Sequence, residues 1–153
     1  MVEQKFIGVV MSVSNELTTV LLDANVASLK REIGGKNYSI GQIGTYVLIP
    51  AGNLVLIGMV QQLVKKDVPI NGQSRQRYVL DVNMVGTVKT GRYERGVSVF
   101  PPVDSPVFLA EDSDLAVAFS VFQKFGFSVG QVSLFENQRA YLDANKFFGK
   151  HIA

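Results

Sequence analysis

The sequence predicts a mainly β fold: a small β-barrel of about six strands, followed by a short α/β segment with one helix. Short runs rich in β-branched and apolar residues follow one another over the first ninety residues. Turns that contain Gly, Pro or Asn separate these runs, and no long helical pattern occurs among them. Strand-rich chains with polar turns favour a closed or partly open barrel.

The first predicted hairpin pairs Phe6–Val13 with Leu17–Leu22 across a turn at residues 14–16. In the first of these strands apolar residues occupy alternate positions, as they do in a half-buried strand. The next segment leaves two readings open. Val26–Ile33 is either a turn of helix or a loose strand, and Gly34-Gly35 ends it.

The following strands are predicted at Thr45–Ile49 and Leu54–Val64, joined by a turn at residues 50–53 that contains Pro and Gly. Both strands are apolar at most positions, which indicates burial on two faces, barrel closure or an oligomer face. Gly58 inside the second strand predicts a bulge or a sharp bend.

Residues 65–76 are predicted as a polar connection that carries the turn dipeptide Asn71-Gly72. A long strand is expected at Arg77–Thr90, where Tyr78 begins a regular alternation of side chains. These segments complete the predicted barrel.

The pattern changes after Gly91. Short extended pieces are predicted at Val97–Phe100, which Pro101-Pro102 ends, and at Val107–Ala110. Asp112 and Asp114 can cap a helix whose apolar residues follow at helical spacing. Two further strands and a one-turn helix are expected, at residues 127–134, 140–142 and 144–148. We therefore divide the chain into a barrel at residues 1–100 and a connecting segment at residues 101–153.

The composition bounds the function. The 153 residues are 47% hydrophobic and 18% charged, with a net charge of +2, one His and no Cys. The absence of Cys excludes a disulfide framework and a thiolate metal site. No apolar run is long enough for a membrane helix and no secretory signal is recognisable, so a cytoplasmic protein without membrane contact is expected. With one His and scattered carboxylates, we expect no catalytic, cofactor-binding or metal-binding residue, and an uncharacterised small enzyme is disfavoured.

Two stretches resemble phosphate-binding loops but lack what the chemistry needs. Gly34-Gly35-Lys36 continues with Asn rather than Ser or Thr. Gly91–Ser98 has the glycine spacing, yet Val97 stands where a lysine would contact the β- and γ-phosphates. Both are interpreted as turns.

Basic residues lie in or beside predicted turns, among them Lys65-Lys66, Arg75 with Arg77, and Arg92 with Arg95. They are either solvated turn charges or contacts to phosphate or to an acidic partner. Few aromatic residues lie among them, which disfavours a base-stacking platform.

The stretch GRYERGVSVFPPVDSPVFLA at residues 91–110 resembles the segment that closes the N-terminal HAS-barrel of HerA-type ATPases, members of the HerA/FtsK superfamily. The segment at residues 141–153 resembles the one directly ahead of the Walker A loop in that family. The early strands are similar to the family's barrel strands in order. Asp104-Ser105 and Gly149 depart from the family pattern, which leaves the subfamily open.

The resemblance implies a fragment of a hexameric DNA translocase or helicase that stops before the ATPase core. Six such barrels form a collar that joins protomers and docks a partner, either a NurA-like nuclease in DNA repair or a sirtuin-like or nuclease effector in anti-phage defence. ATP and Mg²⁺ would bind the full-length parent, which would contact DNA through its motor. No cofactor is expected in this fragment, and without Walker A and B motifs it is not expected to be an enzyme.

The expected oligomer or partner contact lies between residues 92 and 102, because basic, aromatic and rigid residues are combined there. The candidate contact residues are Arg92, Tyr93, Arg95, Phe100, Pro101 and Pro102. The simpler reading is a surface turn that shapes the barrel exit. The alternative function is a stand-alone barrel that binds single-stranded nucleic acid.

Overall fold

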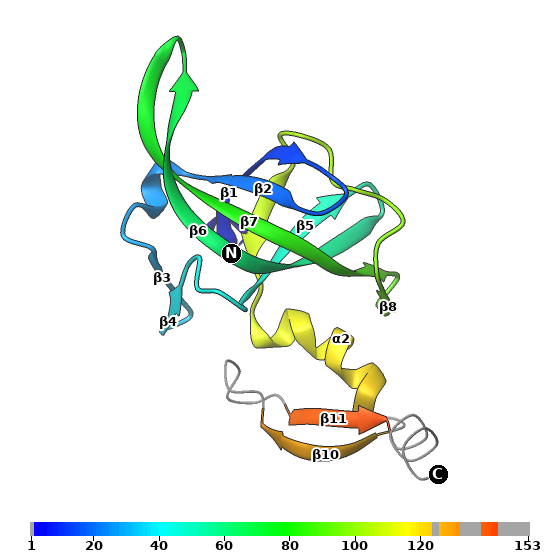
Figure 1. Ribbon diagram of the computed structural model, residues 1–153. Helices are drawn as coiled ribbons and strands as arrows, with labels where there is room; N and C mark the ends of the chain where they lie inside the picture. The colour runs from blue at the N-terminus through cyan, green and yellow to red at the C-terminus, as the bar shows by residue number, and fades with distance from the viewer. Residues whose placement is uncertain (1, 124–125, 132–138, 144–153) are drawn as a thin grey trace, which may run out of the picture.

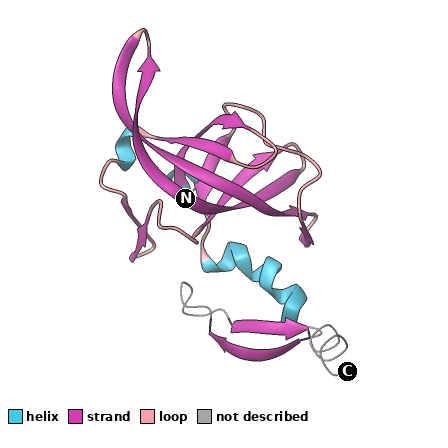
Figure 2. Cartoon of the chain, viewed as in Figure 1, coloured by secondary structure: helices cyan, strands magenta, loops and turns pink. Residues whose placement is uncertain are grey.

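A computed structural model of the chain describes residues 2–123, 126–131 and 139–143 (Figure 1). Strands dominate these residues, and the two regular helices are short (Figure 2). The elements are α1 (Val2–Lys5), β1 (Phe6–Val13), β2 (Thr18–Leu22), the 3₁₀ helix η1 (Ala24–Val26), β3 (Lys30–Ile33), β4 (Lys36–Ser39), β5 (Tyr46–Ala51), β6 (Leu54–Ile70), β7 (Gln73–Lys89), β8 (Arg92–Arg95), β9 (Pro106–Leu109), α2 (Asp112–Gln123), β10 (Gly126–Gln131) and β11 (Arg139–Asp143).

Six antiparallel strands close into a small barrel. They are hydrogen-bonded in the order β2-β1-β9-β5-β6-β7, and β7 pairs back onto β2 at Thr18↔Val82 through Leu21↔Val79. β8 pairs with β7 outside this ring. The prediction of a mainly β fold with a barrel of about six strands is confirmed.

The barrel is filled by aliphatic side chains that alternate along each strand. In β7, for example, Leu80 and Val82 are fully buried. Val26 and Ile40, from the excursion between β2 and β5, join the same cluster. Burying each such side chain contributes about 1.5–3 kcal/mol, so the interior is the main source of stability. The other buried members are Ile7, Val10, Val20, Leu22, Val47, Ile49, Leu56, Val60, Val107 and Leu109.

The predicted polar connection at residues 65–76 is wrong. β6 and β7 are each 17 residues long, and their pairing continues to Ile70↔Gln73. The predicted turn at Asn71-Gly72 is present, with φ angles of 51° and 75°. Two consecutive positive φ values characterise the tight hairpin turn that matches strand twist, so the polar residues on either side stay paired.

The predicted strand at Val97–Phe100 is also wrong, because the strand in this region is β8, at Arg92–Arg95. Thr90 and Gly91 have φ angles of 46° and 72°, and this two-residue turn folds the chain directly back along β7. The residues after β8 form a loop that reaches β1. There the Asp104 N–H donates a hydrogen bond to the Val10 carbonyl, and the Val10 N–H donates one to the Ser105 carbonyl.

The segment around Val26–Ile33, for which a helical turn and a strand were both left open, contains a helical turn followed by a strand. Asp23 caps η1 by accepting a hydrogen bond from the Asn25 N–H. β3 and β4 then form a small hairpin across Gly34-Gly35, with φ angles of 59° and 80°. The four-residue helix α1 was not predicted.

The second segment contains the predicted helix, α2, and a hairpin of β10 and β11 close to the two predicted strands. The predicted helix at residues 144–148 and His151 lie outside the described residues. β9 follows the expected boundary at residue 100 but lies in the barrel between β1 and β5, so the barrel extends at least to Leu109. Among the described helices, none has the length and apolar character needed to cross a membrane.

Candidate protein interface

The predicted contact residues fall into two groups. Arg92, Tyr93 and Arg95 belong to β8, the outermost strand of the sheet, whereas Phe100–Pro102 lie in the loop that leads from β8 to β9. Both arginines are exposed. Among the described strands β8 pairs with β7 alone, so no strand covers its second edge, although α2 contacts β8.

Tyr93 holds β8 in place. A Cβ added at Gly86 would lie 2.2 Å from Tyr93 Cε2, so the ring lies directly against the glycine backbone. The Tyr93 hydroxyl donates a hydrogen bond to the Val85 carbonyl at 3.2 Å. Burial raises the pKa of Tyr93, and it raises the pKa of Tyr46 as well. Tyr93 is therefore half-buried and committed to packing within the chain.

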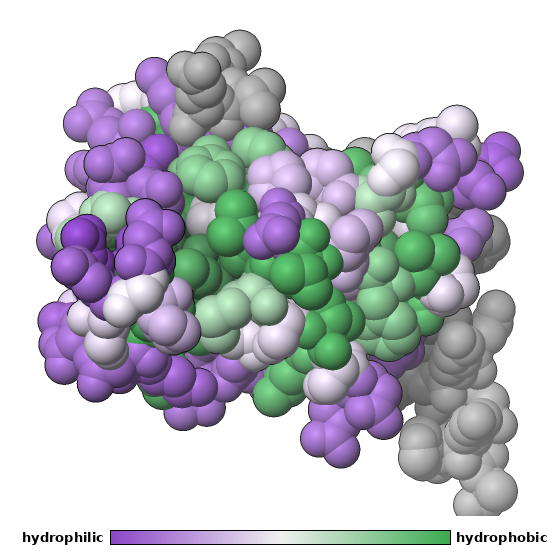
Figure 3. Space-filling model, turned by 90° about the horizontal axis from the view of Figure 1, so that it is seen from above, coloured by the Kyte–Doolittle hydropathy of each residue, from purple (hydrophilic) through white to green (hydrophobic). Residues whose placement is uncertain are grey.

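The loop after β8 exposes apolar side chains. Phe100 is 43% exposed, and its neighbours Val99 and Val103 are 46% and 55% exposed. Pro101 is buried while Pro102 is exposed. Seen from above, apolar residues extend from the middle of the molecule toward its right-hand side, and hydrophilic residues predominate on the left (Figure 3). Four of the six predicted residues, Arg92, Arg95, Phe100 and Pro102, are thus available to a partner.

A second apolar surface, which the sequence did not single out, lies on the outside of the barrel. Phe6, Phe108 and Leu48 are cross-strand partners on β1, β9 and β5, and the two phenylalanine rings meet edge to face at 6.1 Å. They are half-buried and point away from the main core. Next to them is an open groove of about 500 Å³, whose lining residues are Lys5, Ile33, Leu48, Pro50, Val55, Phe108, Glu111 and Asp114. We call this the outer groove.

Part of the same outer face is already covered. Ile57, the partner of Leu48 on β6, packs with Ala110 and with Leu115 of α2, and all three are buried. The row of outward-facing apolar residues is therefore closed over Ile57 and open from Leu48 to Phe6. The signal in the sequence was the nearly continuous apolar character of β5 and β6, which indicates two buried faces.

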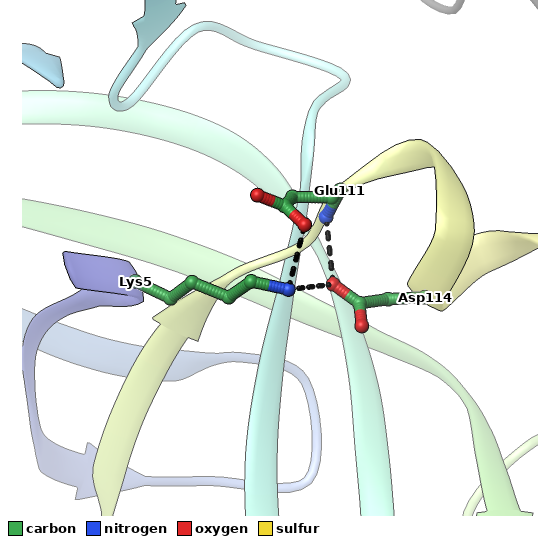
Figure 4. Close-up of polar contacts among 3 residues, drawn as sticks. All are labelled: Lys5, Glu111 and Asp114. Atoms are coloured by element: carbon green, nitrogen blue, oxygen red, sulfur yellow. Dashed lines mark hydrogen bonds and ion pairs between the residues drawn. The ribbon is translucent and has the colours of Figure 1, made fainter. Parts of the chain in front are cut away.

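A charged network borders the outer groove (Figure 4). Lys5 Nζ lies 2.8 Å from Glu111 Oε2 and 3.0 Å from Asp114 Oδ2. Asp114 Oδ2 also accepts the Glu111 N–H at 2.9 Å, which satisfies an amide at the start of α2. Burial lowers the pKa of Lys5, but hydrogen bonds and the charges of both carboxylates outweigh it, and the net pKa is raised. The network joins the start of the barrel to α2.

The two phosphate-loop imitations are hairpin turns with adjoining strand residues. Lys36 follows the Gly34-Gly35 turn as the first residue of β4, and its amine lies 3.4 Å from Asp112. Gly91 belongs to the turn before β8. Within the described ranges, no three His, Cys, Asp or Glu side chains are grouped so that they could hold a metal ion.

No protein-family model matches the chain, and no curated protein matches it.

Proposed function

We propose that this chain is the N-terminal assembly and docking domain of a HerA-type hexameric DNA translocase. The proposal draws on the resemblance at residues 91–110 and 141–153 and on the closed barrel of six strands. In it, the barrels of neighbouring protomers form a collar above the motor. The interface is heterologous and closes into a ring.

The observation that carries the proposal is the outer groove. Monomeric proteins seldom leave a row of large apolar side chains open on the outside of a barrel. Phe108, Leu48 and Val55 line the outer groove, and the cation of Lys5 with its two carboxylates gives it a polar rim. An apolar centre with a polar rim is the usual organisation of a protein interface.

β8 and the loop that follows it offer a second contact. The free edge of β8 can add to a strand of a neighbour, while Arg92 and Arg95 select an acidic surface. Phe100 and Pro102 supply exposed apolar contacts on the loop. In the proposal one of the two surfaces joins protomers and the other docks a NurA-like nuclease or a sirtuin-like or nuclease effector.

The division of labour follows from the same proposal. The parent protein binds ATP and Mg²⁺ in its motor and moves DNA there, working in the cytoplasm in repair or in anti-phage defence. This chain contributes positioning rather than catalysis, and it needs no cofactor of its own.

Native mass spectrometry of the chain joined to its motor tests the assembly role. Val55→Glu in the outer groove and the pair Arg92→Glu with Arg95→Glu on β8 are the informative variants. Ile43→Glu is the control for the groove, because Ile43 is 65% exposed and lies outside it. Lys30→Glu with Arg75→Glu matches the charge change on β8.

We expect one informative variant to break the hexamer and the other to reduce capture of the effector, while both controls leave assembly unchanged. A hexamer and an effector complex that survive both informative variants would contradict the proposal. So would the absence, after Ala153 in the parent gene, of a glycine-rich loop ending in Lys-Ser or Lys-Thr.

The alternative, a stand-alone barrel that binds single-stranded nucleic acid, has one supporting observation. Four cations cluster where β6 and β7 extend beyond the barrel. Salt-sensitive binding of a single strand, in preference to a duplex, would favour this alternative.

A further inference from the structure

The β6–β7 hairpin extends beyond the barrel as a two-stranded arm, which we define as residues 65–77. Its strands pair with each other from Lys65↔Tyr78 to Ile70↔Gln73. β5 pairs with β6 only at residues 54–59, and β2 pairs with β7 only at residues 79–82. Within the described residues no third strand pairs with either edge of the arm, which rises above the rest of the sheet (Figure 1).

The arm holds the net positive charge of the whole chain. Four cations and one carboxylate, Asp67, give residues 65–77 a net charge of 4 − 1 = +3. The chain carries +2 in total, so the other residues sum to 2 − 3 = −1. In the view from above, the side of the molecule with the arm is mainly hydrophilic (Figure 3). The cations in the arm are Lys65, Lys66, Arg75 and Arg77.

Strand register sorts these charges onto two faces. Lys66 pairs with Arg77, and Arg75 pairs with Val68 two residues further along, so all three cations share one face. Asp67 is on the opposite face with Lys65, whose amine lies 5.5 Å from the centre of the Tyr78 ring. The charged residues of one face are thus all basic, and the other face is neutral overall.

The basic face contacts the barrel at its base, and two of its three cations are exposed. The Arg77 guanidinium donates to the Leu22 carbonyl at 2.5 Å, and Val68 is only 9% exposed. Lys66 and Arg75 are exposed. Among the described contacts of the arm, no carboxylate binds the Lys66 amine or the Arg75 guanidinium. The tip adds neutral hydrogen-bonding side chains, namely Asn71, Gln73, Ser74 and Gln76.

We propose that the arm binds the phosphate backbone of double-stranded nucleic acid, with its basic face against the phosphates. A two-stranded ribbon fits the major groove of a duplex. Diagonal neighbours on paired strands lie about 7–8 Å apart, so the exposed Lys66 and Arg75 contact separate phosphates. Neutral amides and hydroxyls at the tip complete backbone contacts of the kind that position proteins on duplexes.

An acidic protein surface is a poorer match. Protein interfaces are centred on apolar or aromatic anchors and depleted of lysine. Beyond the buried Val68, the arm offers only Pro69 and the half-buried Ile70 as apolar residues. The inference does not depend on hexamer formation, because the residues of the arm are distinct from the outer groove and from β8.

Fluorescence anisotropy of the whole chain tests the arm, with a labelled duplex of about 20 base pairs, roughly two helical turns, and a single strand of equal length. The variant is Lys66→Gln with Arg75→Gln. The control is Lys30→Gln with Lys89→Gln, which removes two exposed cations outside the arm. We expect the arm variant to weaken duplex binding about tenfold or more at low salt and to reduce the salt slope by about two.

We expect the control to stay within about twofold of the wild type in the same assay, since phosphate contacts act locally. Circular dichroism checks that both variants fold. Arm-dependent binding that favours the single strand would support the phosphate contact and overturn docking into a duplex groove. The proposal would be overturned if the variant and the control lost duplex affinity equally, or if the wild type did not bind the duplex. It would also be overturned if poly-glutamate competed as well as unlabelled duplex.

Discussion

The two halves of the β6–β7 hairpin have the same backbone structure and opposite surroundings. From Leu54 to Leu63, and opposite it from Leu80 to Lys89, the strands form a wall of the barrel and bury Leu56, Val60 and Leu80. From Lys65 to Arg77 the same antiparallel pairing continues without a neighbour. One half is paired on both sides for much of its length, whereas the other is paired only within itself.

This difference shows that strand pairing and the stability of a hairpin have different requirements. A regular register and a two-residue turn at Asn71-Gly72 are enough to continue the ladder into the arm. An isolated two-stranded hairpin is at best marginally stable in water. The arm therefore depends on the barrel for its order, and its side chains are free to serve recognition.

Truncation of a core residue should have the largest effect. Leu80→Ala removes a side chain with 0% exposure, and we expect it to lower the free energy of unfolding by about 2–5 kcal/mol. Val68→Ala, at 9% exposure in the arm, should cost less than about 1.5 kcal/mol. Urea denaturation measures both. Equal losses would mean that the arm is part of the cooperative core.

Glycine substitutions in the barrel and in the arm should differ less in their effect on stability. A Cβ at Gly58 would lie 2.3 Å from Val82 Cγ1 and 2.8 Å from Met84 Cε, so Gly58→Ala should cost about 1–3 kcal/mol by overpacking. Gly72→Ala meets no atom within 4 Å but has a φ of +75°. Its cost should be about 1–2 kcal/mol of local backbone strain. Hydrogen exchange should then increase in the arm alone for Gly72→Ala and throughout the barrel for Gly58→Ala.

The Lys5 network should contribute less again. Lys5→Met leaves Glu111 and Asp114 without their cation, and we expect a loss of about 1 kcal/mol at neutral pH. Because the pKa of Lys5 is raised in the folded state, its contribution is complete below the ordinary lysine pKa and is lost as pH rises through the folded value. The difference between wild type and variant should therefore be constant near neutrality and shrink above pH 10.5. A difference that grew in alkali would contradict the assigned contacts.

Shortening the arm should change stability least. Deleting residues 69–70 and 73–74 leaves Asn71-Gly72 between Val68 and Arg75, which are already cross-strand partners. The turn and the register are kept, so we expect a change in the free energy of unfolding within about 1 kcal/mol. Thermal unfolding of this variant measures the change. Loss of a folded barrel would show that the arm supports it.

Part of the candidate site could be predicted from the local sequence, and part depended on residues distant in the chain. The exposure of Arg92 and Arg95 agrees with two charges in a short segment after a glycine. The burial of Tyr93 depends on Gly86, seven residues earlier, because the ring occupies the space that a side chain would fill. The outer groove depends on Phe6, Leu48 and Phe108 from three separated strands, and their proximity follows only from the strand order.

The sequence by itself determined the strand alternation, the positions of the tight turns and the start of α2, because side-chain period and backbone φ preferences act over a few residues. The tertiary structure decided that β7 returns to β2, and that α2 covers Ile57 but leaves Phe108 open. These outcomes depend on contacts between residues more than fifty positions apart. Local preferences do not specify such contacts; closing the barrel does, through the burial of one shared core.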